Sequence, residues 1–376
     1  MKQNILMDYV VYQYSLCIAL SLMLFFGFYF FFGRTPEKEI FATYLRSRRI
    51  MGAALLALSA NYSVHLFYGI RFVNVDAAIL MNLSTYFLCY WLFSSALITL
   101  LNRFYLTPKR IWFHLSAWVL FTGLSVWVLF GLSKGTPRHV GLFFMTIWLF
   151  SYGIWLARRI IVTYRRSVRS FDDTHSDYIA VYIKWMSIYT YWAVIYGVSC
   201  GLLTFLPDEY VYLWIISSIP FYIYLFCSYL NYLLFYEQVE RALEVKKDPD
   251  ADDEEEEVEA SDNPQFYEGI SGKLNDWIAG NSFTEPGFTI EDLARALNTN
   301  RTYLSHYIKN IYKMSFREWV TSLRLDYAKK MLLEHPEMNV SQVAEESGFL
   351  SLSYFSKIFT EKEGCSPARW RKGERG

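Results

Sequence analysis

The chain has 376 residues, enough for two or three domains, and its 36 Lys and Arg balance 36 Asp and Glu. Five cysteines without metal or disulfide spacing exclude a zinc-cluster protein or a disulfide framework, so we interpret them as packing residues. The net charge of zero hides an asymmetry along the chain. Aromatic residues make up 19% of the whole chain, and most of them lie in the first 235 residues, whereas charged residues gather in the remainder.

Seven apolar stretches occupy the first part of the chain, each close to the roughly 20 residues that a helix needs to cross a bilayer. Buried core helices of a soluble protein are the alternative, but seven such runs favour membrane spans. The first run is too long for a signal-peptide core and lacks an A-x-A cleavage site, so we expect it to be retained. The stretches are about 10–32, 50–70, 77–101, 111–132, 140–157, 185–206 and 211–235.

Basic residues between these stretches predict the orientation, because cytoplasmic loops carry an excess of Lys and Arg. One side has four, namely Lys2, Arg71, Lys134 and Arg138. The other has fourteen: Arg34, Lys38, Arg46, Arg48, Arg49, Arg103, Lys109, Arg110, Arg158, Arg159, Arg165, Arg166, Arg169 and Lys184. We therefore expect the amino end outside and the carboxyl end in the cytoplasm.

A linker is predicted over residues 236–263. Its first part continues a heptad-like seam from the last apolar stretch, which indicates either a homodimer contact over 229–243 or a plain helical extension. Residues 246–263 then hold ten acidic side chains, a composition typical of a disordered tether. This run is either a solvated spacer or a DNA mimic that shields a basic domain.

The last part of the chain, 264–376, contains an imperfect repeat, with residues 289–309 similar to residues 339–359. Thr289 and Asn339 are good helix N-caps, and Thr289 with Asp292 has the spacing of a capping box. Asn298 and Gly348 stand where each unit turns and tolerate the positive φ that such turns require. We predict two helix-turn-helix units, at about 289–312 and 339–362.

The second helix of each unit should bury one apolar face and present a polar face to a DNA groove. The buried faces would be Leu304, Ile308 and Ile311, and Phe355 and Phe359. A helix over 315–334 would hold the two units apart on neighbouring major-groove segments. The predicted DNA-binding residues are Arg301, Thr302, Ser305, His306, Lys309, Ser351, Leu352, Ser353, Ser356 and Lys357.

Residues from about 286 to 372 resemble the DNA-binding domain of the AraC/XylS family of transcription regulators. The second unit carries the family's signature at Val343, Ala344, Gly348, Phe349, Ser353, Tyr354, Phe355, Ser356, Phe359, Gly364, Ser366, Pro367, Trp370 and Arg371. Outside that signature, the chain also matches the family at Tyr303, Leu304, Ser305, Lys309, Arg324 and Ala328. It departs from the family at Lys313, where glycine is usual, and at Thr360 and Glu361, where lysines are usual. The resemblance implies sequence-specific binding of double-stranded promoter DNA and a contact with RNA polymerase.

Together these observations predict an all-α protein with a seven-helix transmembrane domain over 1–235, the linker, and a DNA-binding domain over 264–376. No phosphate loop, metal cluster or nucleophile elbow indicates an enzyme, a metal or a cofactor. His65, inside a predicted span, is a candidate for sensing a signal or simply a histidine hydrogen-bonded to a neighbouring helix. We expect a one-component transcription regulator of a bacterial inner membrane, embedded in the lipid bilayer and responding to an unidentified signal. A seven-helix transporter or channel with a regulatory tail is the alternative.

Overall fold

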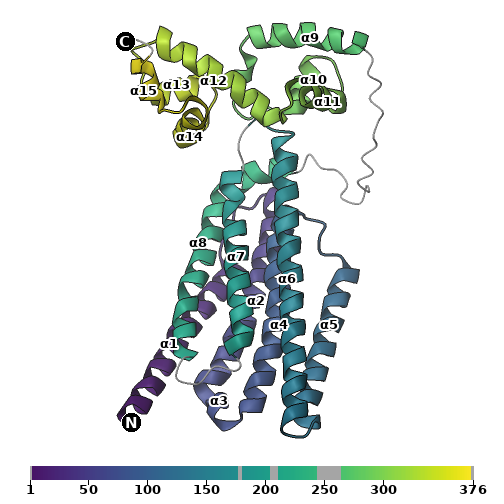
Figure 1. Ribbon diagram of the computed structural model, residues 1–376, viewed down its shortest axis with the longest axis vertical. Helices are drawn as coiled ribbons and strands as arrows, with labels where there is room; N and C mark the ends of the chain where they lie inside the picture. The colour runs from purple at the N-terminus through teal and green to yellow at the C-terminus, as the bar shows by residue number, and fades with distance from the viewer. Residues whose placement is uncertain (1, 177–179, 204–210, 244–263, 374–376) are drawn as a thin grey trace. The chain divides into compact units, whose positions relative to one another are not determined.

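The computed structural model describes residues 2–176, 180–203, 211–243 and 264–373. Within these ranges the chain is helical, as predicted, and it divides into two compact units (Figure 1). The first comprises Met1–Arg166 and Tyr182–Glu244, and the second comprises Ser167–Val181 and Val245–Gly376. The acidic run of 246–263 lies outside the described residues.

The first unit consists of long apolar helices. Among the described residues, six segments are long and apolar enough to cross a membrane, namely Val10–Phe32, Glu39–Tyr68, Val75–Leu101, Pro108–Gly131, Thr136–Asp172 and Val211–Leu234. A further helix, α7, covers much of the predicted stretch 185–206. The helices are α1 Lys2–Phe32, α2 Ala42–Tyr68, α3 Ile70–Val73, α4 Val75–Leu101, α5 Pro108–Val126, α6 Thr136–Asp172, α7 Ala180–Leu203 and α8 Val211–Leu243.

Small residues let α1 and α2 cross closely. A Cβ atom built at Gly27 would lie 2.8 Å from a side-chain carbon of Leu56, and one built at Gly52 would lie 2.9 Å from the ring of Phe31. Close approach of this kind is how helices associate when lipid removes the hydrophobic driving force between them. α2 also packs against α4, and α1 also packs against α8.

Aromatic side chains fill the interior of this unit. The rings of Phe87 on α4 and Tyr152 on α6 stack with centroids 4.1 Å apart, and Tyr189 on α7 stacks on Phe221 of α8 at 4.6 Å. Phe26 on α1 stacks on α8 as well. Part of the aromatic content of this half of the sequence therefore serves helix packing.

The predicted dimer seam on α8 begins with side chains that face the protomer's own interior. Tyr229 and Tyr232 are fully buried. The hydroxyl groups of Tyr229 and Ser47 lie 2.9 Å apart, and the Tyr44 hydroxyl donates to the Tyr229 carbonyl oxygen. These two positions are therefore not available to a partner. Tyr236, Val239 and Leu243 belong to the helix, but their side chains are outside what the structure describes.

The second unit contains α9 Pro264–Ala279, α10 Ile290–Ala296, α11 Arg301–Tyr312, α12 Phe316–Glu334, α13 Val340–Glu346, α14 Leu352–Glu363 and α15 Pro367–Gly373. It has two apolar cores, one at each end of α12. Trp319 and Val320 anchor the first core with α9, α10 and α11, while Ala328 and Leu332 anchor the second with α13, α14 and α15. The predicted connecting helix thus exists and separates two helical pairs.

The segment Ser167–Val181 belongs to the second unit, although it lies inside the region predicted as the transmembrane domain. It contains the last turns of α6 and the start of α7. Its membership depends on contacts with residues more than a hundred positions further along the chain, which local sequence patterns do not reveal.

Candidate nucleic-acid interface

The first helix-turn-helix is α10 and α11. The Thr289 hydroxyl accepts a hydrogen bond from the Asp292 amide, and the Asp292 carboxylate accepts one from the Thr289 amide, which completes the predicted capping box. This exchange lowers the pKa of Asp292, chiefly through the Thr289 hydroxyl. At the turn, Asn298 has a φ of 51°, the left-handed conformation expected there.

The second helix-turn-helix, α13 and α14, repeats this construction. Asn339 forms a capping box with Gln342. Gly348 has a φ of 82° at the turn, as predicted, and the Phe349 amide donates to the Ala344 carbonyl oxygen just after it. Phe355 and Phe359 are fully buried, so the predicted inner face of α14 is confirmed.

On α11 the predicted DNA-binding residues share the side away from the core. Thr302 and Lys309 are exposed, and Arg301, Ser305 and His306 are half-buried. Two of the cations already have carboxylate neighbours: Arg301 Nη1 lies 2.8 Å from Glu291, and Lys309 Nζ lies 2.9 Å from Asp173.

One expectation about the inner face of α11 was wrong. Leu304 and Ile308 are buried, but Ile311 is 54% exposed. The next residue, Tyr312, packs on the core instead, with its ring centroid 5.7 Å from that of Trp319. The larger ring covers the end of the core and leaves the isoleucine outside.

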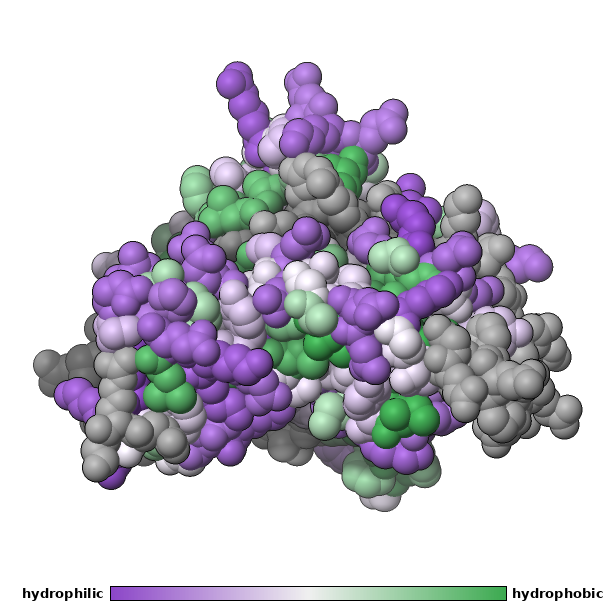
Figure 2. Space-filling model, turned by 90° about the horizontal axis from the view of Figure 1, so that it is seen from above, coloured by the Kyte–Doolittle hydropathy of each residue, from purple (hydrophilic) through white to green (hydrophobic). Residues whose placement is uncertain are grey.

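On α14, the predicted residues Ser351, Leu352, Ser353 and Lys357 are exposed, and Ser356 is half-buried. Ser351 also has a structural role, because its hydroxyl caps α14 by accepting from the Tyr354 amide. Figure 2 shows a face of the molecule that is mostly hydrophilic, with separate hydrophobic patches. Exposed side chains of this kind are able to reach a groove without unfolding any core.

The sequence patterns did not reveal the structural role of Arg324. Its side chain is only 2% exposed, and its guanidinium donates to the carbonyl oxygens of Phe283 and Glu285, each at 2.8 Å. It also lies over the Phe288 ring. This arginine joins α12 to the loop before α10, so its match to the family pattern reflects folding and not DNA contact.

Lys313, a departure from the family pattern, follows α11 with a φ of 55°. Glycine adopts this left-handed conformation without steric cost, whereas a lysine is strained by about 1 kcal/mol. The family's usual glycine is thus explained by the backbone at this position.

His65 lies in a buried polar cluster of the first unit. Its Nε2 is 3.0 Å from the Asn82 Oδ1 on α4, and Asn61 Nδ2 donates to the same oxygen and to Thr85 Oγ1. Within the described part of the chain, His65 Nδ1 and Asn61 Oδ1 have no hydrogen-bond partner. A cavity of about 40 Å³ adjoins this cluster and is lined in part by Asn61, His65, Arg71 and Asn82.

Comparison with known proteins places the C-terminal unit in a class. Residues 293–373 match a family described as a helix-turn-helix domain. The chain is 32% identical over 85 residues to the HTH-type transcriptional regulator ExsA of Pseudomonas aeruginosa, covering 23% of this chain and 30% of ExsA. It is 30% identical over 118 residues to the HTH-type transcriptional activator RhaR of an Enterobacter species, covering 31% of this chain and 41% of RhaR.

A third relative, the virulence regulon transcriptional activator VirF of Yersinia enterocolitica, is 31% identical over 85 residues, which are 23% of this chain and 31% of VirF. The chain thus spans less than half the length of these relatives. Residues 293–373 form an AraC-type helix-turn-helix domain, which confirms the resemblance to the AraC/XylS family over these residues. These named relatives are transcription regulators, in agreement with the expectation that this chain is not an enzyme.

Proposed function

We propose that this protein is a membrane-anchored transcription regulator of a bacterial inner membrane that binds specific promoter DNA through α11 and α14. The observation that carries the proposal is the presence, in one chain, of an AraC-type helix-turn-helix domain and of long apolar helices. RNA polymerase is the partner through which such a regulator would change transcription.

The outer side chains of the first unit support the membrane anchor. Soluble proteins rarely expose large contiguous apolar patches. Helices α1, α5 and α6 instead expose many large apolar residues, including Phe25, Phe28, Phe32, Trp112, Phe113, Val119, Leu120, Phe143, Phe144 and Ile154. Lipid is the environment in which such surfaces are stable.

Topology adds independent support. The segment Ser167–Val181 lies between two apolar helices and makes its contacts within the C-terminal unit. This supports a topology in which residues 167–181 and the C-terminal helices lie on the same side of the bilayer. The basic residues Arg158, Arg159, Arg165, Arg166 and Arg169 come just before or within this segment, and such residues favour the cytoplasm, where DNA is.

The His65 cluster is the site that we propose for a signal. Polar side chains inside a membrane are costly and usually functional. Asn82 Oδ1 accepts from Asn61 Nδ2, so His65 Nε2 donates to it and His65 Nδ1 is an acceptor. His65 Nδ1 and Asn61 Oδ1 are then two buried acceptors beside this cavity that have no partner among the described residues, and they fit a hydroxyl or ammonium group of a small ligand.

Two experiments test the proposal with the full-length chain. Membranes are washed with carbonate, and the DNA fragments bound in the cell are then sequenced after immunoprecipitation. We expect the protein to remain with the membrane and to enrich discrete promoter fragments. A protein released by the wash would refute the anchor, and fragments no more enriched than in an untagged strain would refute the DNA-binding function.

The signal site is tested by promoter output. The His65→Ala variant should change the activity of a promoter found by that mapping without changing the affinity of the solubilised protein for its DNA. His139→Ala, an exposed histidine at the start of α6, is the matched control. Unchanged output in both variants would remove the His65 cluster from the mechanism.

A further inference from the structure

The chain between α6 and α7 pairs with the start of the first helix-turn-helix through its backbone. The Ile290 amide donates to the Thr174 carbonyl oxygen at 2.9 Å, and the Ser176 amide donates to the Phe288 carbonyl oxygen at 3.1 Å. His175 and Thr289 lie opposite each other in an antiparallel bridge. Ile290 is the first residue of α10, where an amide has no partner inside its own helix, so Thr174 supplies the missing acceptor.

The side chains of this segment are buried against the same domain. Phe171, Thr174, His175 and Ser176 are each less than a tenth exposed. The His175 ring stacks on Phe171 with centroids 4.1 Å apart, and its Nδ1 lies 2.7 Å from the Thr174 hydroxyl. The Ser176 hydroxyl also accepts a hydrogen bond from Arg324. This is a packed interface and not a surface contact.

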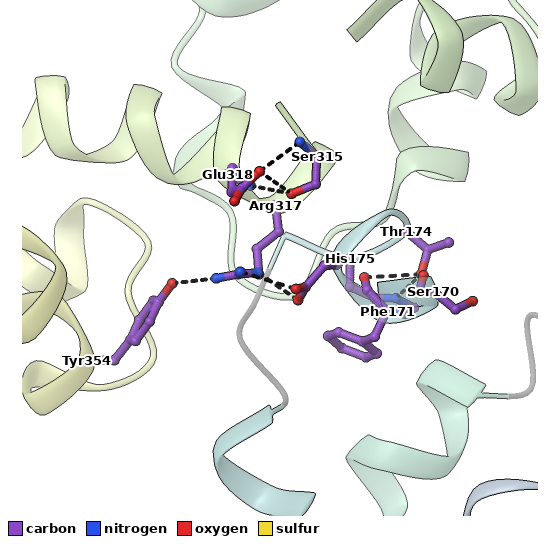
Figure 3. A network of polar contacts seen from close by, with 9 residues as sticks. Ser170, Phe171, Thr174, His175, Ser315, Arg317, Glu318 and Tyr354 are labelled. Atoms are coloured by element: carbon purple, nitrogen blue, oxygen red, sulfur yellow. Dashed lines mark hydrogen bonds and ion pairs between the residues drawn. The ribbon is translucent and has the colours of Figure 1, made fainter. Parts of the chain in front are cut away.

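Two neighbouring carboxylates add charge to the contact. Asp172 lies 2.7 Å from Arg317 Nε. The guanidinium of Arg317 also donates to the Tyr354 hydroxyl, as Figure 3 shows. Asp173 accepts a hydrogen bond from Lys309 Nζ at 2.9 Å. Arg317 begins α12, and Lys309 is on α11 among the predicted DNA-binding residues.

We propose that residues 167–176 form a docking segment that competes with DNA for the first helix-turn-helix, with Asp173 occupying Lys309 in place of a phosphate. This inference rests on the proposed function. A carboxylate at 2.9 Å from an ammonium and a phosphate oxygen satisfy the same donor, so Lys309 cannot serve both at full strength.

The energetics of the Lys309–Asp173 ion pair suit a reversible exchange of Lys309 between carboxylate and phosphate. Lys309 is about half exposed, and exposed ion pairs are worth only about 0.2–1 kcal/mol. Duplex DNA has a much denser array of negative charge and would displace a single carboxylate. The same helix, α6, continues from Thr136 to Asp172, so a change in the apolar unit that moves its end would alter this competition.

The charge competition is tested with the full-length protein in detergent and a random-sequence duplex of about 30 base pairs, long enough for two neighbouring major-groove segments. Asp173→Asn should tighten binding about two- to fivefold at low salt, the range that an exposed ion pair supplies. The gain should fade as salt screens it. Asp326→Asn is the matched control, because it removes an ion pair of equal length with Lys329 inside α12.

Lys309→Gln makes the test specific. It should weaken DNA binding more in the Asp173→Asn background than in the parent, because only there is Lys309 free for phosphate. Equal effects in both backgrounds, or unchanged affinity for Asp173→Asn, would overturn the competition. If neither parent nor variants bind DNA at all, the proposed function fails instead.

Docking itself has a readout that does not require DNA. In the parent, exchange of the Ile290 amide with solvent should be slow, and Ser176→Pro, which removes the donor to Phe288, should accelerate it about tenfold or more. Ser176→Ala keeps that donor and should preserve slow exchange. Added duplex should also accelerate exchange at Ile290. Fast exchange in the parent would disprove docking, and slow exchange unaffected by saturating duplex would show that docking and DNA binding coexist.

Discussion

A Cβ atom at position 348 would lie 2.3 Å from the carbonyl oxygen of Thr284, because the turn of the second helix-turn-helix packs directly on the loop before α10. The same position has a φ of 82°. Two independent reasons therefore favour glycine at position 348: the backbone has a positive φ, and there is no space for a side chain.

We therefore expect Gly348→Ala to reduce the free energy of unfolding of the C-terminal unit by about 2–4 kcal/mol, since strain and overpacking add. Gly364→Ala is the control: its φ is 74°, but a Cβ there meets nothing within 4 Å. Only conformational strain of about 1–2 kcal/mol should remain in that variant. Denaturant-dependent amide exchange within residues 264–373 would measure both, and equal losses would contradict the packing argument.

The outer faces of α11 and α14 should set DNA affinity. We expect Arg301→Ala, His306→Ala and Lys357→Ala to weaken binding to an identified promoter fragment. Losing a base contact should cost about 1–3 kcal/mol of binding free energy at its own base pair. Losing a phosphate contact should weaken binding to all DNA sequences and reduce the slope of log K against log salt concentration by about 1.

Lys330→Ala serves as the control for these variants, because Lys330 is exposed on α12 and not on either predicted face. Affinities are measured by fluorescence anisotropy across a salt series. If all three variants bind as tightly as the parent, other faces of the domain contact DNA.

Orientation in the membrane is tested by reporter fusions along the chain. Fusions at 75, 136 and 209 should report the outside, and fusions at 40, 106, 170 and the carboxyl end should report the cytoplasm. The fusion at 170 is the most informative, because this position belongs to the same compact unit as the DNA-binding helices. A carboxyl end found outside would refute the regulator function.

Acid should release the docking segment. Burial lowers the pKa of His175 from 6.5 to about 4, with nearby Arg301 lowering it further and Asp292 opposing this. A depressed pKa means that the released segment binds a proton more readily than the docked one. Docking is therefore fully stable above pH 6.5 and is lost progressively between about pH 6.5 and 4.

From pH 7 to 5 the free energy of docking should fall by about 2 kcal/mol. Exchange of the Ile290 amide, corrected for its intrinsic rate at each pH, measures this change. His175→Phe retains a ring to stack on Phe171 and cannot take up a proton, so its docking should not respond over this range. A parent protein with equally flat behaviour would contradict the assignment to His175.

Local patterns in the sequence predicted most of the fold. The caps at Thr289 and Asn339, the positive φ of Asn298 and Gly348, and the inner face of α14 depend on residues within a few positions of each other. Such features follow from backbone geometry and helical periodicity, which any short stretch of chain expresses by itself.

Tertiary structure alone decided the rest. Ile311 has helical spacing for the core, yet Tyr312 takes its place because only the assembled domain determines where the core ends. Arg324 and the pair of Asp173 with Lys309 depend on segments that are far apart in sequence. A buried guanidinium or a carboxylate partner is specified by whatever lies opposite it in space, and no periodicity within one element contains that information.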